Sequence, residues 1–172
     1  MSTGRHVLVM AKAPVAGKVK TRLCPPYTLE QAAQVAEAAL ADTLAAVAGC
    51  GAPRRILALA GEPGPWLPPG FEVIAQRGTS LAERLAHAWS DAGGPGLQIG
   101  MDTPQVQPAE LDRLLAEVAP GRAVLGAAND GGWWVIGLAG VDPAAVFAGV
   151  PMSTSVTGEL QRRRLEALGQ RV

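Results

Sequence analysis

Short apolar runs alternate with helix-like segments along nearly the whole chain, and this alternation constrains the fold more than any other feature. Six runs have the length and composition of strands, at residues 6–11, 54–60, 71–76, 96–101, 122–128 and 133–139. Four segments have helical character, at about 28–48, 80–92, 108–119 and 157–168. Because helices between strands make parallel crossovers, we expect an α/β fold: a three-layer α/β/α sandwich around a mostly parallel, locally mixed sheet.

Two of the predicted helices begin with recognisable caps. Thr28 and Gln31 have the spacing of a capping box, and Ser80 stands directly before an amphipathic segment. The chain has 172 residues, of which 48% are hydrophobic, and it contains no convincing linker or internal repeat. We therefore expect a single domain over residues 1–172.

Charge and cysteine usage exclude several classes of protein. The formal net charge is zero and no long block of one sign occurs, so nucleic acid is not an expected partner. Glu37 and Asp42 interrupt the alanine-rich segment, which argues against a membrane span. Cys24 and Cys50 lack the spacing of a zinc site or a disulfide framework, so we expect a reducing, cytoplasmic location. The oligomeric state cannot be predicted from the sequence.

The stretch MAKAPVAGKVKTRL, residues 10–23, concentrates positive charge in a loop broken by proline and glycine. All three lysines of the chain, Lys12, Lys18 and Lys20, lie here with Arg22, and residues 1–27 contain no acidic side chain. The loop lacks the glycine pattern of a dinucleotide fold and the hydroxyl residue of a P-loop. A solvated loop is one interpretation; a loop that wraps a diphosphate, with backbone N–H groups near Gly17, is the other.

Asp102 and Asp130 follow apolar runs at the expected carboxyl edge of the sheet, where ligands bind in folds of this class. Asp102 lies in GMDTP and could be a turn residue, but Mg²⁺ is commonly bound by one or two carboxylates together with substrate phosphates. Asp130 lies in NDGGWW, which could be an ordinary tight turn or a loop whose glycines let the backbone approach a ligand. Adjacent strand residues point to opposite faces, so Trp133 and Trp134 cannot both be fully in one core.

The stretch QRGTSLAERL places Arg77 and Ser80 at the start of a helix, where backbone donors can bind an anion or a base edge. His6 and His87 have no neighbouring partners at metal-ligand spacing, and no nucleophile motif is present. Covalent hydrolase chemistry is therefore not expected.

Five stretches in order, AKAPVAGKVKTRL, QRGTSLAERL, GMDTP, NDGGWWVIGL and VPMSTS, resemble a bacterial family with the glycosyltransferase-A (GT-A), or nucleotide-diphospho-sugar transferase, fold. That family comprises arsenosugar-biosynthesis and radical-SAM/selenodomain-associated transferases and is similar to 2-phospholactate guanylyltransferases. The chain departs from it at Met101, where the family has serine, and at Asn129, where it has an acidic residue.

The resemblance implies a role for each matching position. The nucleotide would be bound by Lys12, Ala13, Gly17, Lys18, Lys20, Arg22, Arg77 and Ser80. Asp102 would hold Mg²⁺ or Mn²⁺, and Asp130 would face the reaction centre as a base, an orienting group or a second ligand. The acceptor pocket would contain Asn129, Gly131, Gly132 and Trp133.

The activity that follows is a metal-dependent transferase with a nucleotide-activated donor, most simply a glycosyltransferase that uses a nucleoside-diphosphate sugar and a small-molecule acceptor. The alternatives are a nucleotidyltransferase, which releases pyrophosphate from a triphosphate, and a nucleotide-binding module without turnover. The base, the sugar, the acceptor and the stereochemical outcome are not predictable from the sequence.

Overall fold

The computed structural model describes residues 4–172 and contains one six-stranded sheet. Its strands run in the order β3-β2-β1-β4-β6-β5. β1, β2, β3 and β4 are mutually parallel, whereas β6 pairs antiparallel with β4, and β5 pairs antiparallel with β6. This confirms the predicted mixed sheet. The strand bounds are β1 His6–Lys12, β2 Arg54–Ala60, β3 Glu72–Ala75, β4 Gly96–Gly100, β5 Val124–Ala127 and β6 Trp133–Leu138.

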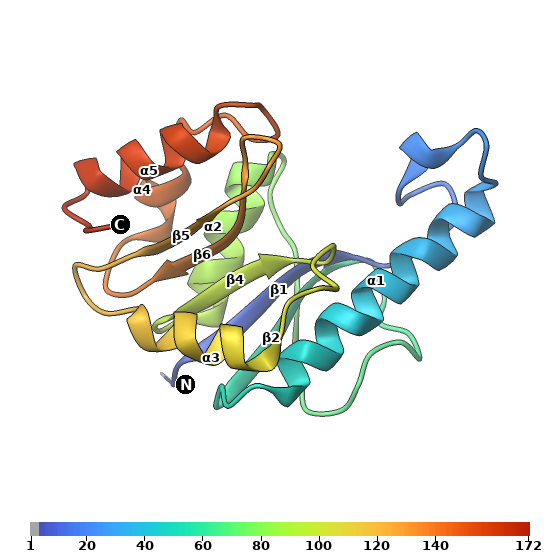
Figure 1. Ribbon diagram of the computed structural model, residues 1–172, viewed down its shortest axis with the longest axis horizontal. Coiled ribbons are helices and arrows are strands. Elements are labelled where there is room, and N and C mark those ends of the chain that lie inside the picture. The colour runs from blue at the N-terminus through green and yellow to red at the C-terminus, as the bar shows by residue number, and fades with distance from the viewer. Residues whose placement is uncertain (1–3) are drawn as a thin grey trace.

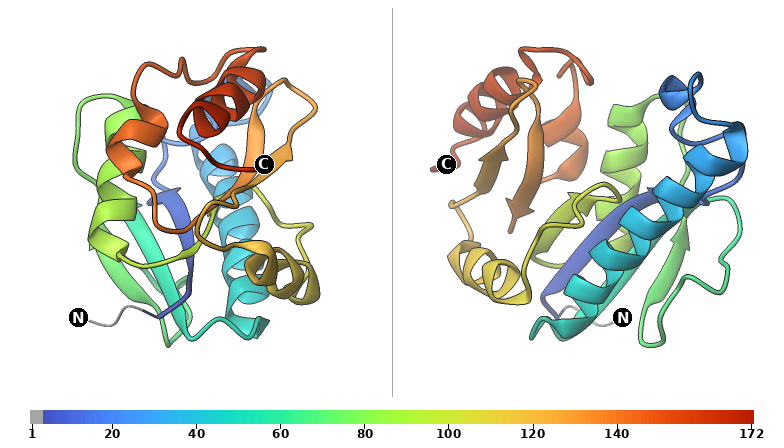
Figure 2. Two further views of the ribbon diagram at one scale, coloured as in Figure 1. Left: turned by 90° about the vertical axis from the view of Figure 1, so that its left-hand side faces the viewer. Right: turned by 45° about the vertical axis from the view of Figure 1, so that its right-hand side comes forward.

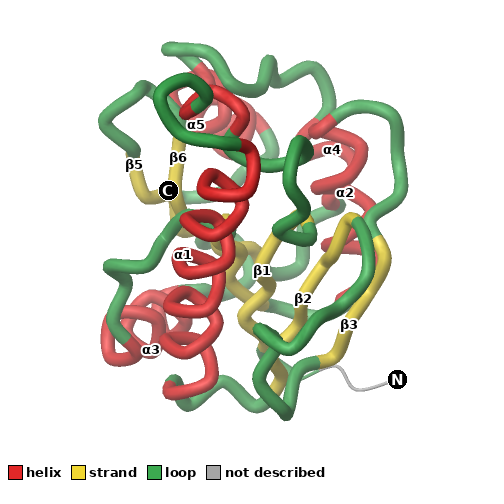
Figure 3. Tube along the Cα trace, turned by 90° about the vertical axis from the view of Figure 1, so that its right-hand side faces the viewer, coloured by secondary structure: helices red, strands yellow, loops and turns green. Residues whose placement is uncertain are grey.

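Helices cover both faces of the sheet, which confirms the three-layer sandwich (Figures 1 and 2). α1 and α3 lie on one side, and α2 and α4 lie on the other (Figure 3). α5 packs with α4 on this second side. The helix bounds are α1 Leu29–Gly49, α2 Leu81–Ala92, α3 Pro108–Glu117, α4 Pro143–Phe147 and α5 Thr157–Ala167, with a short 3-10 helix at Thr21–Leu23.

The alternation of side chains along β1 builds the two cores. Val7 and Val9 pack in the core under α1 and α3, whereas Leu8 and Met10 pack in the core under α2, α4 and α5. All four side chains are buried, because β1 is central and covered on both faces. Burial of this kind explains why the strand appears in the sequence as a continuous apolar run.

Local capping signals in the sequence agree with the structure. Thr28 and Gln31 form a complete capping box at the start of α1, and Ser80 forms another with Glu83 at the start of α2. The 3-10 helix and the five-residue α4 were not predicted, because such short elements have no measurable periodicity. Within residues 4–172, no helix is both long enough and apolar enough to cross a membrane. Both cysteines are free.

The strand ends define one edge of the sheet. Met10 on β1 lies opposite Ala58 on β2 and Gly100 on β4, so these three parallel strands end at nearly the same level. The loop after β1 is held against α1 by a small cluster in which Val19 packs on Ala33 and Ala36. Figure 1 shows this loop and the start of α1 on the side of the molecule opposite β5 and α5.

His6, at the start of β1, is buried and packs against Trp89. Its ring lies 5.2 Å from the ring of Trp89, centroid to centroid, with an interplanar angle of 59°. Burial, and secondly the positive charge of Arg54, lower the pKa of His6 from 6.5 to about 4. The imidazole is therefore neutral in the folded protein at pH 7.

We predict that His6 makes the fold less stable in mild acid. Below pH 6.5 the unfolded chain binds a proton at His6 that the folded chain does not bind until about pH 4, so stability falls as pH falls through this window. From pH 7 to pH 4.5 this group should lower the free energy of unfolding by about 2 kcal/mol. Urea denaturation at both pH values should show a smaller pH dependence for His6→Leu than for the native chain. An equal pH dependence in both proteins would contradict the assignment.

Candidate active site

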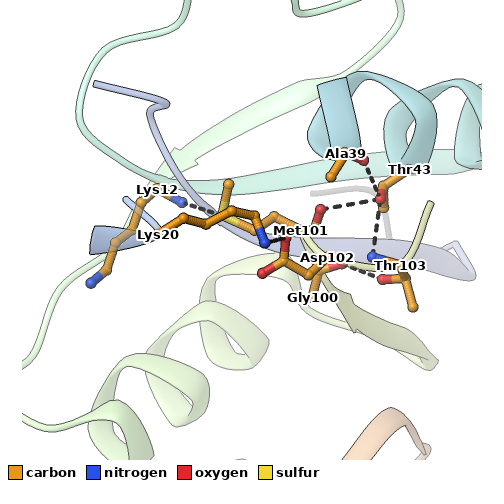
Figure 4. Close-up of polar contacts among 8 residues, drawn as sticks. All are labelled: Lys12, Lys20, Ala39, Thr43, Gly100, Met101, Asp102 and Thr103. Carbon is orange, nitrogen blue, oxygen red and sulfur yellow. Dashed lines mark hydrogen bonds and ion pairs between the residues drawn. The ribbon is translucent and has the colours of Figure 1, made fainter. Parts of the chain in front are cut away.

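The loops after β1 and β4 come together at the carboxyl edge of the sheet. The Nζ atom of Lys20 lies 2.8 Å from Oδ1 of Asp102 (Figure 4). Lys20 adopts the left-handed backbone conformation, with φ 47° and ψ 33°, which is uncommon for a residue with a side chain. The Asp102 side chain is 57% exposed, so its second oxygen is accessible to solvent and to a ligand.

Thr43, on α1, fixes the backbone around Asp102. Its Oγ1 lies 2.7 Å from the Ala39 carbonyl and 3.2 Å from the Met101 carbonyl, and it accepts a hydrogen bond from the Thr103 N–H at 3.3 Å (Figure 4). Thr43 is fully buried. Sequence reasoning missed this residue, because a single threonine inside an alanine-rich helix gives no sign that it contacts a distant loop.

Met101 links the same loop to β1. The backbone N–H of Lys12 points to the Met101 sulfur at 3.4 Å, a weak hydrogen bond between neighbouring strand ends. The methionine that departs from the family pattern therefore contributes to the packing beneath the site.

A cleft of about 410 Å³ opens beside Asp102. Asp102 and Asp130 both line it, as do Gly132, Trp133 and Trp134, so the structure brings the two predicted carboxylates to one cavity. The remaining lining residues come from β1, α2, β4, the loop after each of β4 and β5, and the start of α5 with the segment before it: Met10, Leu81, Leu85, Gln98, Gly100, Thr103, Ala128, Met152, Ser153 and Thr157. None of these ten was predicted as a site residue, because most are apolar or small residues that look the same as core residues in a sequence.

A second cavity, of about 610 Å³, lies at the end of β1 and β2. Lys12, Ala13 and Lys18 line it together with Val15, Ala60, Gly61 and Glu62. Gly61 has φ +108°, and a Cβ there would lie 2.8 Å from the Cβ of Ala13, so the two loops can approach only with a glycine at this position. Lys12 and Lys18 of the basic loop therefore line this cavity, whereas Lys20 pairs with Asp102, a residue of the cleft.

The other predicted nucleotide-binding residues lie elsewhere. Gly17 and Arg22 are exposed on the loop and line neither cavity. Arg77 donates to both carboxylate oxygens of Asp91, at 3.1 and 2.7 Å, and this pair lowers the pKa of Asp91. Ser80 caps α2 and lines a separate groove between α2 and α4. A nucleotide-binding role for these four residues stays a prediction.

The loop with Asp130 is held by a hydrogen bond within the loop and by one from the start of α5. Oδ1 of Asp130 accepts a hydrogen bond from the Gly132 N–H at 2.9 Å, and Gly158 donates to the Gly131 carbonyl at 2.8 Å. Asn129 is exposed, and neither it nor Gly131 lines the cleft. Of the predicted acceptor residues, Gly132 and Trp133 are therefore at the cavity.

The two tryptophans pack on opposite faces of the sheet, as expected. Trp133 packs with the α2 side and lies 6.5 Å from Phe147, centroid to centroid, whereas Trp134 packs with the α1 side. Both are half-buried and both line the cleft. Two aromatic residues therefore line the cleft.

The donor set of the cleft fits a hard divalent cation only in part. Within residues 4–172, no three acidic, histidine or cysteine side chains are grouped as metal ligands. Asp102 and Asp130 supply carboxylate oxygens, which suit Mg²⁺ and Mn²⁺, but the remaining ligands would have to be water and substrate phosphate oxygens. Metal binding that depends on a phosphate ligand is consistent with this donor set.

The two glycines after Asp130 have different structural roles, and substitution should separate them. A Cβ at Gly131, where φ is +87°, would lie 2.0 Å from the Ser155 carbonyl oxygen, whereas a Cβ at Gly132 would meet only Asp130, at 3.1 Å. We expect Gly131→Ala to lower the free energy of unfolding by more than about 1 kcal/mol, because both φ and space are wrong for alanine. Gly132→Ala should cost clearly less. Equal losses in urea denaturation would show that the loop does not dock on the segment before α5.

Two solved structures share the fold over nearly the whole chain. A candidate nucleotide-diphospho-sugar transferase from Desulfovibrio desulfuricans G20 has a TM-score of 0.78 at 28% identity, and the likeness covers 95% of this chain and 77% of that one. A nucleotidyl transferase from Methanothermobacter has a TM-score of 0.61 at 15% identity, covering 96% and 84%. These matches confirm the predicted nucleotide-diphospho-sugar transferase type of fold.

The sequence comparisons identify a family but no activity. No curated protein matches the chain. The narrower resemblance to arsenosugar-biosynthesis and radical-SAM-associated transferases stays a prediction. Residues 28–154 match the family described as uncharacterized protein conserved in bacteria (DUF2064), and the chain belongs to that family.

Proposed function

We propose that this chain is a metal-dependent transferase with a nucleotide-activated donor, and that the donor is a nucleoside-diphosphate sugar. The observation that carries the proposal is the contact between Lys20 and Asp102, which places a cation and a carboxylate 2.8 Å apart in reach of the cleft that Asp130 also lines. The likeness to the candidate nucleotide-diphospho-sugar transferase from Desulfovibrio desulfuricans supports the same donor class.

The distribution of positive charge favours a diphosphate at the end of β1. Lys20 is the only one of the loop's four cations, Lys12, Lys18, Lys20 and Arg22, that forms an ion pair among residues 4–172. Lys12 and Lys18 line the second cavity. If the nucleoside part of the donor bound there, the attached phosphates would lie near the two ammonium groups. The transferred sugar would then extend toward Asp102 and the cleft.

Asp102 and Asp130 would hold Mg²⁺ or Mn²⁺ together with the phosphate oxygens. When bound, the cation supplies positive charge that stabilises the departing diphosphate. Lys20 has the same effect on the phosphate oxygens from the other side. Because both groups act on charge that develops as the donor bond breaks, they lower the barrier and do more than bind the substrate.

The acceptor would bind in the cleft, next to Asp130. Its hydroxyl oxygen forms a bond to the anomeric carbon of the sugar, and the bond from that carbon to the β-phosphate oxygen breaks. The electron pair leaves with the nucleoside diphosphate, and the hydroxyl proton passes to Asp130 or to water. One oxygen of Asp130 already accepts the Gly132 N–H, so the other is the one that can orient or deprotonate the acceptor.

We predict that Lys20→Met weakens nucleotide binding without unfolding the protein. A charge-assisted hydrogen bond to phosphate is lost, so the affinity for UDP or GDP in the presence of Mn²⁺ should fall about tenfold or more. The exposed pair with Asp102 contributes at most about 1 kcal/mol to stability. The matched control is Arg163→Met, which breaks the Arg163–Glu159 pair, also 2.8 Å long, on the surface of α5. If both variants bind the diphosphate as the native chain does, Lys20 is not a phosphate ligand.

Asp102→Asn should remove the gain in diphosphate affinity that Mn²⁺ gives, because the variant loses the charge that faces the cation. Calorimetric titration of UDP and GDP, with Mn²⁺ and with chelator, measures this gain directly. A variant that keeps the full gain would exclude Asp102 as the metal ligand.

Release of pyrophosphate from a nucleoside triphosphate, without release of a diphosphate from a nucleotide sugar, would favour the nucleotidyltransferase alternative.

A further inference from the structure

The cleft beside Asp102 and Asp130 is built mainly from large apolar side chains. Met10 comes from β1, Leu81 and Leu85 come from α2, and Met152 comes from the segment before α5. Trp133 and Trp134 line it from β6, with their side chains on opposite faces of the sheet. Six large apolar residues from four parts of the chain therefore line a volume of about 410 Å³, at the place that the proposed function gives to the acceptor.

Several polar side chains of the cleft are already bonded within the protein. Thr103 donates to the Gly100 carbonyl, and Thr157 donates to the Pro151 carbonyl at 2.7 Å. The Gln98 side-chain oxygen accepts the Trp89 indole N–H at 3.1 Å. A molecule with many hydroxyl groups would thus find few partners here to replace its bonds to water, and its desolvation would cost free energy.

The apolar walls have the composition that suits a ring. Two tryptophans offer faces and edges to an aromatic group, and the thioethers of Met10 and Met152 make favourable contacts with aromatic rings. The Trp133 ring packs against the ring of Phe147, so packing within the protein fixes its position. Leu81, at the first turn of α2, is 45% exposed and lines the cleft, so its side chain is accessible to a ligand there.

We propose that the acceptor of the transfer is an apolar, ring-bearing alcohol, whose ring lies among these side chains and whose hydroxyl faces Asp130. This inference rests on the proposed function for the identity of the reaction. The binding of an apolar alcohol in the cleft can nevertheless be measured on its own. In the balanced reaction, the alcohol and the nucleoside-diphosphate sugar give the glycoside of the alcohol, the nucleoside diphosphate and one proton.

The test is a saturation-transfer NMR titration with three model acceptors: 2-(2-naphthyl)ethanol, 1-octanol and glycerol. Each carries at least one primary hydroxyl, so differences in affinity report on the body of the molecule. We expect naphthylethanol to bind more tightly than octanol, and glycerol to bind least. If octanol binds most tightly, the claim that the acceptor carries a ring is wrong. If glycerol binds as tightly as naphthylethanol, or if naphthylethanol does not bind, the claim that the acceptor is apolar is wrong.

A pair of matched variants locates the ligand. Leu81→Ser removes an apolar side chain that lines the cleft, and Val73→Ser removes one of similar exposure, 43%, on β3 and away from the cleft. Both residues are exposed, so both variants should fold. Leu81→Ser should weaken naphthylethanol binding about fivefold, the effect of roughly 1 kcal/mol of lost apolar contact, and Val73→Ser should not change it. Equal affinities in all three proteins would overturn the assignment of the cleft.

The same titration with UDP or GDP and Mn²⁺ separates the two proposals. If neither diphosphate binds but naphthylethanol binds in the native chain and is weakened by Leu81→Ser, the proposed transferase function fails and the apolar site is supported. If a diphosphate binds and naphthylethanol does not, the acceptor class fails and the transferase function is supported.

Discussion

The parallel pairing of β1 with both β2 and β4 is the constraint on which the rest of the site depends. Met10 lies opposite Ala58 on one side and Gly100 on the other, and backbone hydrogen bonds hold this register. A shift by one residue would exchange the two faces of β1 and place Leu8 and Val9 in the wrong cores. The loops that follow β1 and β4 therefore have to emerge side by side. Val19, which packs on α1, holds the loop after β1 where Lys20 reaches Asp102.

The pair formed by Lys20 and Asp102 is suited to exchange its partners. Both groups are partly exposed, so the pair contributes little to stability and separates at little cost. A diphosphate with its divalent cation carries the same two charges: the phosphate oxygens would replace Asp102 at Lys20, and the cation would replace Lys20 at Asp102. Lys20 and Asp102 would therefore each have an opposite charge beside them both before and after the ligand binds. Binding of the cation and the phosphate should accordingly be coupled, which agrees with the small number of carboxylates at the cleft.

The parts of the structure that depend on local sequence were predictable, and the parts that depend on distant contacts were not. The apolar run at residues 6–11 and the caps at Thr28 and Ser80 are local signals, and the structure has the corresponding strand and helix starts. Arg77 looked like an anion ligand, but its partner is Asp91, a whole helix away in the sequence. Thr43 lies in no motif, and Leu81 lies in QRGTSLAERL without a predicted role, because the importance of both comes from what the folded chain places against them. α4 is too short for any periodicity to appear.

A crystal structure of the protein with a nucleoside diphosphate and Mn²⁺ would test the central claim most directly, because anomalous scattering locates the metal independently of the model. We predict Mn²⁺ coordinated by the Asp102 carboxylate and by phosphate oxygens, with Lys20 moved from Asp102 to the diphosphate and the nucleoside in the cavity of Lys12 and Lys18. The contrary result is a nucleotide bound elsewhere, such as the groove between α2 and α4, with the contact between Lys20 and Asp102 intact.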